Sequence, residues 1–205
     1  MFTGIIQSLG QVFSIQPQEG GVRLIIDPKE WPINPWPSHG DSICVNGCCL
    51  TYAPKPDDNS AFLQFDVITE SLQKTNLGQL APADPVNLET SLTPTTAMGG
   101  HFVQGHIDGQ GLVTQIIHTP DDFRVVVQVT DDFLKYLVPK GSVTIDGVSL
   151  TIASVATEKK QFEVALIPTT LELTTLGNTK VGHAVNLESD MIARTVVHYL
   201  SLTNP

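Results

Sequence analysis

The sequence predicts an all-β protein of two tandem six-stranded antiparallel barrels, related by internal duplication, plus a C-terminal α-helix. Four sequence blocks recur in the same order about 100 residues apart, and each half contains about six short runs suited to β-strands. The last helical segment has no counterpart in the first half. Because repetition in order at one spacing indicates a duplicated domain, we expect the first barrel over residues 1–97, the second over 98–188, and the helix and tail over 189–205.

Four blocks carry the duplication. They are VNGCCLTY (45–52) and IDGVSLTI (145–152), TNLG (75–78) and TTLG (174–177), VNLE (86–89) and VNLE (185–188), and FTGII (2–6) and FVQGHI (102–107). The copies differ at single positions within most blocks. The two halves can therefore hold similar but unequal sites.

β-Strands are expected at 22–26, 62–67 and 124–129, where β-branched and alternating apolar residues predominate. Glycine, proline, asparagine and aspartate separate such runs, as at 57–59 and 109–111. Six antiparallel strands joined by short turns suit a small closed barrel, because closure leaves no exposed sheet edge.

A short helix is expected at 131–137, where DDFLKYL begins with acidic residues that favour a helix N-terminus and ends before a proline. The matching segment of the first half, 28–31, is a weaker candidate because Pro32 and Pro35 follow it closely.

The C-terminal segment at 189–200 is the other helical candidate. Ser189 or Asp190 can cap its N-terminus. Its apolar residues fall on one face at helical spacing: Ile192, Val196, Tyr199 and Leu200. Such a face either docks on the chain's own second barrel or packs with copies of the helix from other subunits.

Composition argues against several functions. The formal net charge is -10, whereas nucleic-acid binding needs clustered Lys and Arg. No apolar run approaches the roughly 18 residues that span a bilayer, and MFTGIIQSLG lacks the basic region and cleavage pattern of a signal peptide. We expect no nucleic acid and no membrane as partners, and a cytoplasmic protein beginning at Met1. Cys44, Cys48 and Cys49 are odd in number and crowded together, which favours neither disulfides nor a metal site.

Together the blocks resemble riboflavin synthase of the alpha-chain type. The resemblance rests on MFTGI, NGCCLT, FDVxxESLxxTNLG, GGHFVQGHIDG, KGSVTIDGVSLT, LIPTTLExTTLG and the paired VNLE, and it runs from Met1 to about residue 200. It implies Greek-key barrels and a C-terminal helix that holds a homotrimer. It also implies dismutation of two 6,7-dimethyl-8-ribityllumazine molecules to riboflavin and 5-amino-6-(D-ribitylamino)uracil, without a cofactor or metal. Association with lumazine synthase is a further expectation.

This resemblance gives the duplication a physical meaning. A reaction between two identical substrates needs two similar pockets, and holding both reactants at near-attack distance gives effective molarities of ~10⁵ M or more. In the family, the first barrel of one subunit pairs with the second barrel of its neighbour. No redox cofactor is needed, because electrons pass between the two substrates.

The resemblance and the divergence between the copies point to four candidate catalytic residues: Cys49, His106, Ser149 and Asp190. Cys49 aligns with Ser149, so a nucleophile or proton donor can differ between the pockets; Cys49 can also be only a wall residue. His106 aligns with the apolar Ile5 and can act as a general base or acid. Asp190 matches a family acid near the subunit interface, and a helix cap is the alternative reading.

Substrate contacts are expected at corresponding places in the two halves. The candidates are Gly4, Ile5, Ile6, Cys49, Leu50, Thr51, Asp66, Val67, Ile68, Thr69, Glu70, Ser71, Gly105, His106, Ile107, Lys140, Ser149, Leu150, Thr151, Ile167, Pro168, Thr169, Thr170, Leu171 and Glu172. Thr51 and Thr151 are expected to hydrogen-bond the ligand, and the loops at 66–71 and 167–172 to edge the pockets. Lys140 is either a contact to a neighbour's ligand or a solvated turn lysine.

Two further residues keep structural alternatives. His101 lies five residues before His106, but no third ligand follows in a metal-binding pattern, so a structural histidine is a fair reading. Asp146 aligns with Asn46 and is at least as well explained as a turn residue before Gly147.

Two other protein classes compete with an enzyme. Lumazine proteins carry the ligand without turnover, but they tend to lose the histidines of GGHxxxGH and the second SLT, both of which this chain keeps. A flavin-reductase-like barrel would need an attached nicotinamide domain. The chain departs from many relatives at 92–98, LTPTTAM, where they carry charged residues, but this linker leaves the pocket blocks intact.

Overall fold

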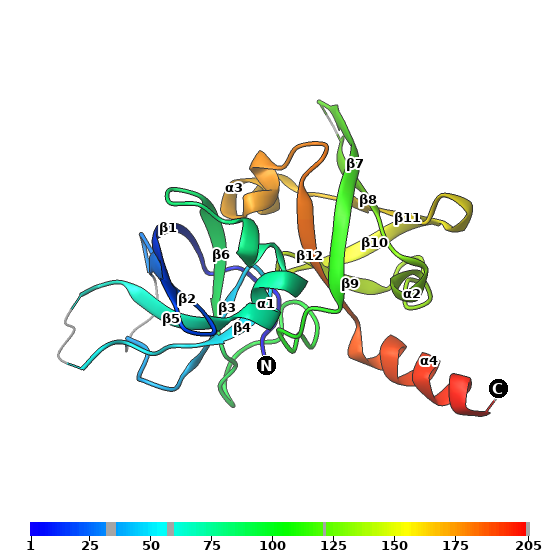
Figure 1. Cartoon of the computed structure of the whole chain (residues 1–205). Helices are drawn as coiled ribbons and strands as arrows, with labels where there is room; N and C mark the ends of the chain where they lie inside the picture. Colours follow the sequence, from blue (N-terminus) through cyan, green and yellow to red (C-terminus); the bar gives the residue numbers. More distant parts are fainter. Residues whose placement is uncertain (32–35, 57–59, 121, 204–205) are drawn as a thin grey trace.

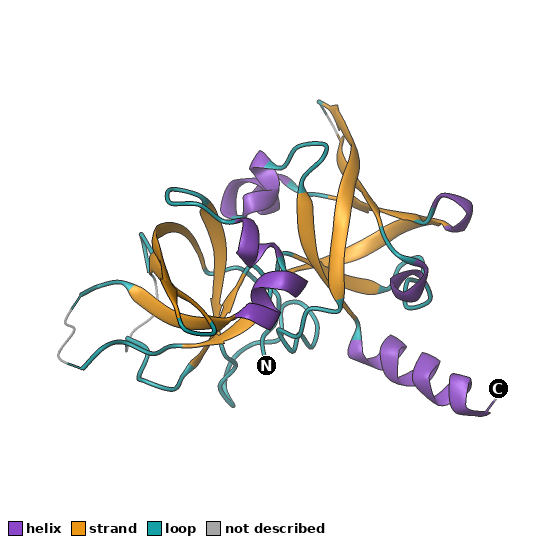
Figure 2. Cartoon of the chain, in the orientation of Figure 1, coloured by secondary structure: helices purple, strands orange, loops and turns teal. Residues whose placement is uncertain are grey.

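The chain forms two β-sheet lobes side by side, with the last helix projecting away from both (Figure 1). This computed structural model describes residues 1–31, 36–56, 60–120 and 122–203. The turn expected at 57–59 and two of the prolines expected to end a helix, Pro32 and Pro35, lie outside the described residues. Strands dominate both lobes, and short helices sit at their ends (Figure 2).

The first lobe is a six-stranded antiparallel sheet. Its strands are β1 (Ser8–Gln18), β2 (Gly21–Asp27), β3 (Ser42–Val45), β4 (Cys48–Thr51), β5 (Leu63–Ile68) and β6 (Pro85–Thr90). They are ordered β4-β3-β6-β1-β2-β5, and the two outer strands approach each other at a single antiparallel bridge between Tyr52 and Phe65. Closure is limited because Pro54 and Pro56 follow β4, and proline cannot donate a ladder hydrogen bond.

The second lobe is a closed barrel with the same strand order. It comprises β7 (Gly109–Thr119), β8 (Asp122–Gln128), β9 (Ser142–Ile145), β10 (Val148–Ala156), β11 (Gln161–Ala165) and β12 (Ala184–Ser189). Even the irregularities repeat, since the register shifts at Val12/Ser14 in β1 and at Val113/Gln115 in β7. The prediction of an all-β fold built by internal duplication is confirmed.

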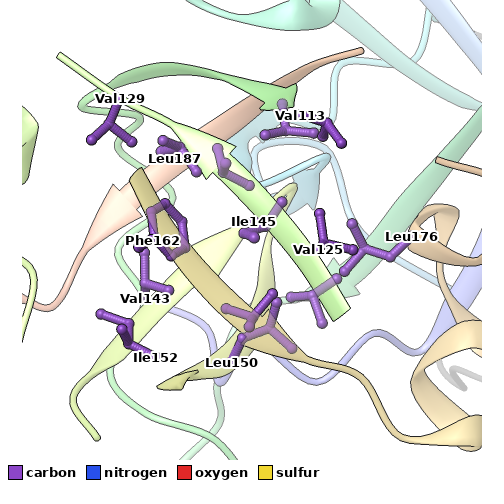
Figure 3. Close-up of a cluster of buried hydrophobic side chains, with 14 of the residues drawn as sticks. Val113, Val125, Val129, Val143, Ile145, Leu150, Ile152, Phe162, Leu176 and Leu187 are labelled. Atoms are coloured by element: carbon purple, nitrogen blue, oxygen red, sulfur yellow. The ribbon is translucent and has the colours of Figure 1, made fainter. Parts of the chain in front are cut away.

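Each lobe has its own apolar core, because strand residues alternate between the interior and the outer face. In the second barrel, side chains such as Val125, Ile145, Phe162 and Leu187 meet in the interior (Figure 3). Leu24, Ile43 and Phe65 do the same in the first lobe. At about 1.5–3 kcal/mol for each large apolar side chain fully buried, these cores stabilise the two lobes separately.

Short helices connect some of the strands. Equivalent ones follow β5 and β11: α1 (Thr69–Lys74) with the 3₁₀ turn η1 (Asn76–Gln79), and α3 (Pro168–Leu173) with η3 (Thr175–Asn178). The segments expected as loops are therefore partly regular: 66–71 contains the end of β5 and the start of α1, and 167–172 contains most of α3. A further 3₁₀ turn, η2 (Thr157–Lys159), joins β10 to β11.

The helix expected at 131–137 is shorter in the structure, α2 (Asp131–Leu134). Thr130 Oγ1 caps its start by accepting a hydrogen bond from Phe133 N, and turn-type bonds such as Leu137 N to Leu134 O replace helical ones after it. The weaker helical candidate at 28–31 is not a helix.

The C-terminal helix α4 (Met191–Thr203) is confirmed. Asp190 caps it, since one carboxylate oxygen accepts hydrogen bonds from Ile192 N and Ala193 N at 2.7 and 3.3 Å. Arg194 ties it to the second lobe through Asp108, at 2.7 Å. Its apolar side chains are exposed: Ile192, Val196, Tyr199, Leu200 and Leu202. Among the described residues, no helix is long and apolar enough to cross a membrane.

The two lobes meet through duplicated hairpin turns. Asn46-Gly47 joins β3 to β4 and Asp146-Gly147 joins β9 to β10, and all four residues have the positive φ of a type I′ turn. The turns lie back to back, because a Cβ atom on Gly47 would come 2.7 Å from Gly147 N. Polar side chains link them across the interface.

The asparagines of the two VNLE blocks make this link. Asn87 Nδ2 donates to the Asp146 carbonyl at 2.9 Å, and Asn186 Nδ2 donates to the Asn46 carbonyl at 2.8 Å. Asp146 itself is buried, and its Oδ1 accepts bonds from Asn186 N and Asn76 Nδ2, both at 2.8 Å. Burial raises the pKa of Asp146 to about 7, while these hydrogen bonds act in the opposite direction.

Candidate functional site

The duplicated segments 2–6 and 102–107 meet between the lobes. Phe2 N donates to Val103 O at 2.7 Å, and Val103 N donates to Phe2 O at 3.1 Å. Both side chains are fully buried and pack with Cys44 in a small cluster between the lobes. We call residues 2–6 and 102–107 the first and second head segments, because each precedes the first strand of its own lobe.

A buried glutamate of the VNLE block holds each head segment. Glu89 accepts hydrogen bonds from Thr3 N, Thr3 Oγ1 and Gly4 N at 2.6–3.0 Å. Glu188 accepts bonds from the amides of Gln104, Gly105 and His106 at 2.7, 2.8 and 3.1 Å. Burial raises the pKa of both carboxyl groups, and the hydrogen bonds partly oppose this. The repeated glutamate therefore has a specific task, which is to fix main-chain amides.

Each head segment then lies against the other lobe. Gly4 O accepts a hydrogen bond from Ser149 N, and Gly105 O accepts one from Cys49 N, both at 2.8 Å. Gly4 and Gly105 have φ of +75° and +78°, and a Cβ atom on either would come 2.6 Å from the Cβ of its partner. Only glycine can make this approach without a shift of the backbone.

Each head segment thus packs against the lobe to which it does not belong, and this exchange of head segments includes contacts with the cores. Ile6 packs in the core of the second barrel, and Ile107 packs against the core of the first lobe. The surroundings of Cys49 are therefore formed by the first lobe and the second head segment. The surroundings of Ser149 are formed by the second lobe and the first head segment. Sequence reasoning did not predict this exchange, because the contacts join residues that are far apart along the chain, such as Gly4 and Ser149.

The first candidate site is the outer face of the first lobe around Cys49. Cys48 and Leu50 point inward and are buried, so Cys49 and Thr51 point outward. The register of the Tyr52–Phe65 bridge, when extended, sets Thr51 opposite Asp66 and Cys49 opposite Ile68. Ile68 is 58% exposed. Gly105 of the second head segment contacts Cys49, and the exposed His106 follows it along the chain.

The second candidate site is the equivalent face around Ser149. Ser149 and Thr151 point outward from β10, and the register of Ile152 with Val164, when extended, sets Ser149 opposite Ile167. Ile167 is 64% exposed. Gly4 of the first head segment contacts Ser149, and the exposed Ile5 follows it along the chain. The structure therefore brings the predicted residues together as two equivalent open faces.

The three cysteines have different surroundings. Cys44 and Cys48 are buried, and burial raises the pKa of the Cys48 thiol to about 12 and that of Cys44 well above its usual value. Cys49 is half-buried. Because the thiolate is the reactive form, only Cys49 among the three is placed for chemistry with a ligand.

The second site contains His101, which was not among the predicted catalytic or substrate-contacting residues. His101 Nδ1 lies 2.7 Å from Ser149 Oγ. Burial lowers the pKa of His101, and the charge of Asp190 acts in the opposite direction. The GGH motif drew attention to this histidine. Its partner Ser149 is 48 positions away along the chain, so sequence spacing alone could not reveal the pair.

The first site contains an aspartate whose equivalent in the second lobe is an alanine. Asp66 pairs with Arg23 at 2.6 Å and also accepts a bond from Gln18 at 3.1 Å. Arg23 is held in turn by the Ala53 carbonyl and Gln64. Ala165 stands at the position equivalent to Asp66, so the two copies differ in this carboxylate.

Other candidate residues take less direct positions. The side chains of Leu50, Val67 and Leu150 are buried in the cores, so these residues could contact a ligand only through main-chain atoms. Ser71 and Thr170 lie at equivalent positions in the first turns of α1 and α3, with Thr69, Glu70, Pro168, Thr169, Leu171 and Glu172 around them.

Ile6 and Glu172 line a cleft of about 310 Å³ beside the second site. Lys140 is exposed in a turn with φ of +68°. Asp190 caps α4. Within the described ranges, no group of three or more His, Cys, Asp or Glu side chains is arranged to hold a metal ion.

Comparison with known proteins agrees with the duplication. Residues 3–91 and 104–190 each match the lumazine binding domain family. The chain is 41% identical to the riboflavin synthase of Mycobacterium tuberculosis over 199 residues, covering 96% of each chain. It is 39% identical to that of Chlamydia pneumoniae over 197 residues, covering 96% of this chain and 94% of the relative.

Solved structures show the same architecture. LumP complexed with riboflavin superposes with a TM-score of 0.81 at 25% identity, covering 92% of this chain and 99% of LumP. LumP complexed with 6,7-dimethyl-8-(1'-D-ribityl) lumazine gives a TM-score of 0.79 at 24% identity, with the same coverage.

Proposed function

The chain belongs to the riboflavin synthase family, and we propose that its two candidate sites are the places where it binds and converts lumazine. The reaction takes two molecules of 6,7-dimethyl-8-ribityllumazine. One gives a four-carbon unit to the other, so that riboflavin and 5-amino-6-(D-ribitylamino)uracil leave. This is the last step of riboflavin biosynthesis, and as a group transfer it makes the protein a transferase.

One observation carries the assignment of the sites. The duplication repeats the same outward face, with a small polar residue on the fourth strand, an exposed isoleucine opposite and a glycine of the exchanged head segment beside it. Cys49, Ile68 and Gly105 form one face, and Ser149, Ile167 and Gly4 form the other. Two like faces suit two identical substrates.

The differences between the faces suit unequal roles. We assign Cys49 as a nucleophile or proton donor and His106 as a general base or acid at the first site. Ser149 serves the second site. Thr51 and Thr151 point outward, where a hydroxyl can hydrogen-bond the ring or the ribityl chain. Asp190, beside the capped start of α4, is proposed to orient a base near a subunit interface.

The open faces and α4 support the assembly that we propose. Both sites lie on the surface of the single chain. The helix α4 leaves the second lobe (Figure 1), and its apolar side chains are exposed. We propose a homotrimer in which α4 packs with its copies. The first site of one subunit would then face the second site of its neighbour, which excludes water and brings the two lumazines together.

Several finer points belong to the same proposal. The functional units are residues 1–97, 98–188 and 189–205. The protein acts in the cytoplasm. Association with lumazine synthase would deliver the substrate directly from the enzyme that makes it.

The test is turnover. The full chain is incubated with 6,7-dimethyl-8-ribityllumazine, and riboflavin fluorescence is followed over many site equivalents. We expect continuous riboflavin formation. Stoichiometric retention of lumazine without turnover would instead identify a carrier of the LumP type, which shares this architecture.

A further inference from the structure

His101 is brought to Ser149 by the segment that joins the lobes. Its main-chain N donates to Thr3 O at 3.1 Å, and its Nδ1 lies 2.7 Å from Ser149 Oγ. The preceding residue must be small, because a Cβ atom on Gly100 would come 2.1 Å from Thr3 O and 2.9 Å from Ser149 Oγ. The imidazole is therefore held on the outer face of β10, at the second site.

The other ring nitrogen indicates the tautomer. His101 Nε2 is buried and has no hydrogen-bond partner. A neutral imidazole carries one N–H donor and one acceptor, and burial keeps this ring neutral by lowering its pKa. A proton on Nε2 would leave a buried N–H without an acceptor, which is rarer in proteins than an unsatisfied acceptor. The proton therefore belongs on Nδ1, which donates to Ser149 Oγ.

This hydrogen bond constrains what Ser149 can do. A serine becomes a nucleophile when an adjacent base accepts its proton, but Nδ1 already carries one. The bond occupies a lone pair of Ser149 Oγ and leaves the hydroxyl proton available elsewhere. Ser149 is half-buried, so a ligand at the second site can reach that proton.

Resting on the proposed function, we infer that His101 is a positioning residue that turns the Ser149 hydroxyl toward the lumazine bound at the second site, where Ser149 acts as a hydrogen-bond donor and not as a nucleophile. The acceptor is a carbonyl oxygen or an unprotonated nitrogen of the ring. When the 7-methyl group loses a proton, negative charge spreads onto those atoms, so a fixed donor stabilises the anion. In the described part of the chain, no histidine is hydrogen-bonded to Cys49 Sγ, which makes this arrangement specific to the second site.

Variants of the full chain separate this role from the alternatives. In His101→Asn, the amide N–H can take the place of Nδ1–H without titrating, whereas in His101→Gln it lies nearer the place of Nε2. Ser149→Ala removes the donor. Ser149→Cys copies the residue of the first site and leaves a weaker donor of similar size.

The readout is the bound substrate itself. Lumazine is titrated with pH on each protein, and its absorption spectrum reports the fraction present as the anion; kcat and KM are measured alongside. We expect Ser149→Ala and His101→Gln to raise the pH of half-ionisation of bound lumazine by about one unit and to lower kcat about tenfold or more. His101→Asn should exceed His101→Gln in kcat at least fivefold, and Ser149→Cys should fall between wild type and Ser149→Ala.

Opposite results overturn the inference. If Ser149→Ala leaves the ionisation of lumazine unchanged, or if His101→Asn loses as much activity as His101→Gln, His101 does not orient a donor. A rate that falls with the protonation of His101 in wild type, and loses this acid limb in His101→Asn, would make the histidine a base. Wild-type protein that forms no riboflavin would refute the proposed function, whereas normal wild-type turnover with any of the other results refutes only the role of His101.

Discussion

Replacing one VNLE glutamate should loosen a strand of the opposite lobe. In Glu188→Gln, the side-chain oxygen can keep the bonds from Gly105 N and His106 N, but the new NH₂ group then faces Gln104 N. One partly buried amide, Gln104 N, loses its acceptor, at a cost of about 1–3 kcal/mol. The remaining bonds lose charge assistance, while relief of the buried charge offsets part of that loss. We expect the second head segment to open more easily by about 1–3 kcal/mol in total.

The consequence should appear at Cys49, because its amide donates to Gly105 O. Amide exchange through local opening becomes tenfold faster for every 1.4 kcal/mol by which the free energy of opening falls. Exchange of Cys49 N–H should therefore accelerate roughly 5- to 150-fold. Amide exchange resolved by NMR measures this directly. Ser149 N–H, bonded to the other head segment, should change little.

Glu89→Gln is the matched control. It weakens the bonds to Thr3 and Gly4, so it should accelerate Ser149 N–H and spare Cys49 N–H. Exchange at Val127 in the second core reports unfolding of the second barrel as a whole and should stay slow in both variants. Two results would refute the claim that each head segment packs against the other lobe. One is that each variant loosens the strand of its own lobe, and the other is that both amides respond equally to either change.

Four other changes test separate parts of the structure. Cys49→Ser should fold normally, since Ser149 occupies the equivalent position, and should lower kcat more than it raises KM; unchanged kcat would leave Cys49 as a wall residue. His106→Gln should lower kcat by about 10²–10⁴ with little loss of ligand affinity, and a drop below about threefold would show that another group removes the methyl proton. A chain ending before Asp190 should sediment as a smaller species with little activity, whereas a trimer would contradict the role given to α4. Asp146→Asn should flatten the dependence of stability on pH. Burial raises the pKa of Asp146 from an ordinary 3.8 to about 7, so the folded chain keeps a proton that the unfolded chain releases, and wild-type stability falls as pH rises through that window. At about 1.4 kcal/mol per pKa unit, urea unfolding should show a wild-type loss of at most roughly 4 kcal/mol that the variant lacks; equal slopes would refute this.

The fold could be predicted because its determinants are local and repeated. Asn46-Gly47 and Asp146-Gly147 specify tight hairpins, and the alternation of buried and exposed residues in β4 and β10 places Cys49 and Ser149 outward. The extent to which each sheet closes into a barrel was harder to predict. The incomplete closure of the first lobe depends on Pro54 and Pro56, whose effect on a distant strand is not visible in a local pattern.

The candidate site could be predicted only in part. Matching the copies identified Cys49, Ser149 and His106 as positions of interest, since divergence within a duplicated block is visible in the sequence. The exchange of head segments and the bond from His101 to Ser149 were not visible. They depend on contacts across the whole chain, such as Gly4 with Ser149, that no spacing or periodicity encodes. Asp66 was expected as a ligand contact, but its pairing with Arg23 again required the folded sheet.

The most direct test of the central claim is a mass balance on the reaction. Purified wild-type protein is given 6,7-dimethyl-8-ribityllumazine alone, with no added metal or redox cofactor, and all species are separated and quantified over time. The duplicated sites predict that two lumazines disappear for each riboflavin and each 5-amino-6-(D-ribitylamino)uracil that appear, through many turnovers. Lumazine that remains bound and unchanged, or riboflavin formed without the uracil, would contradict the claim.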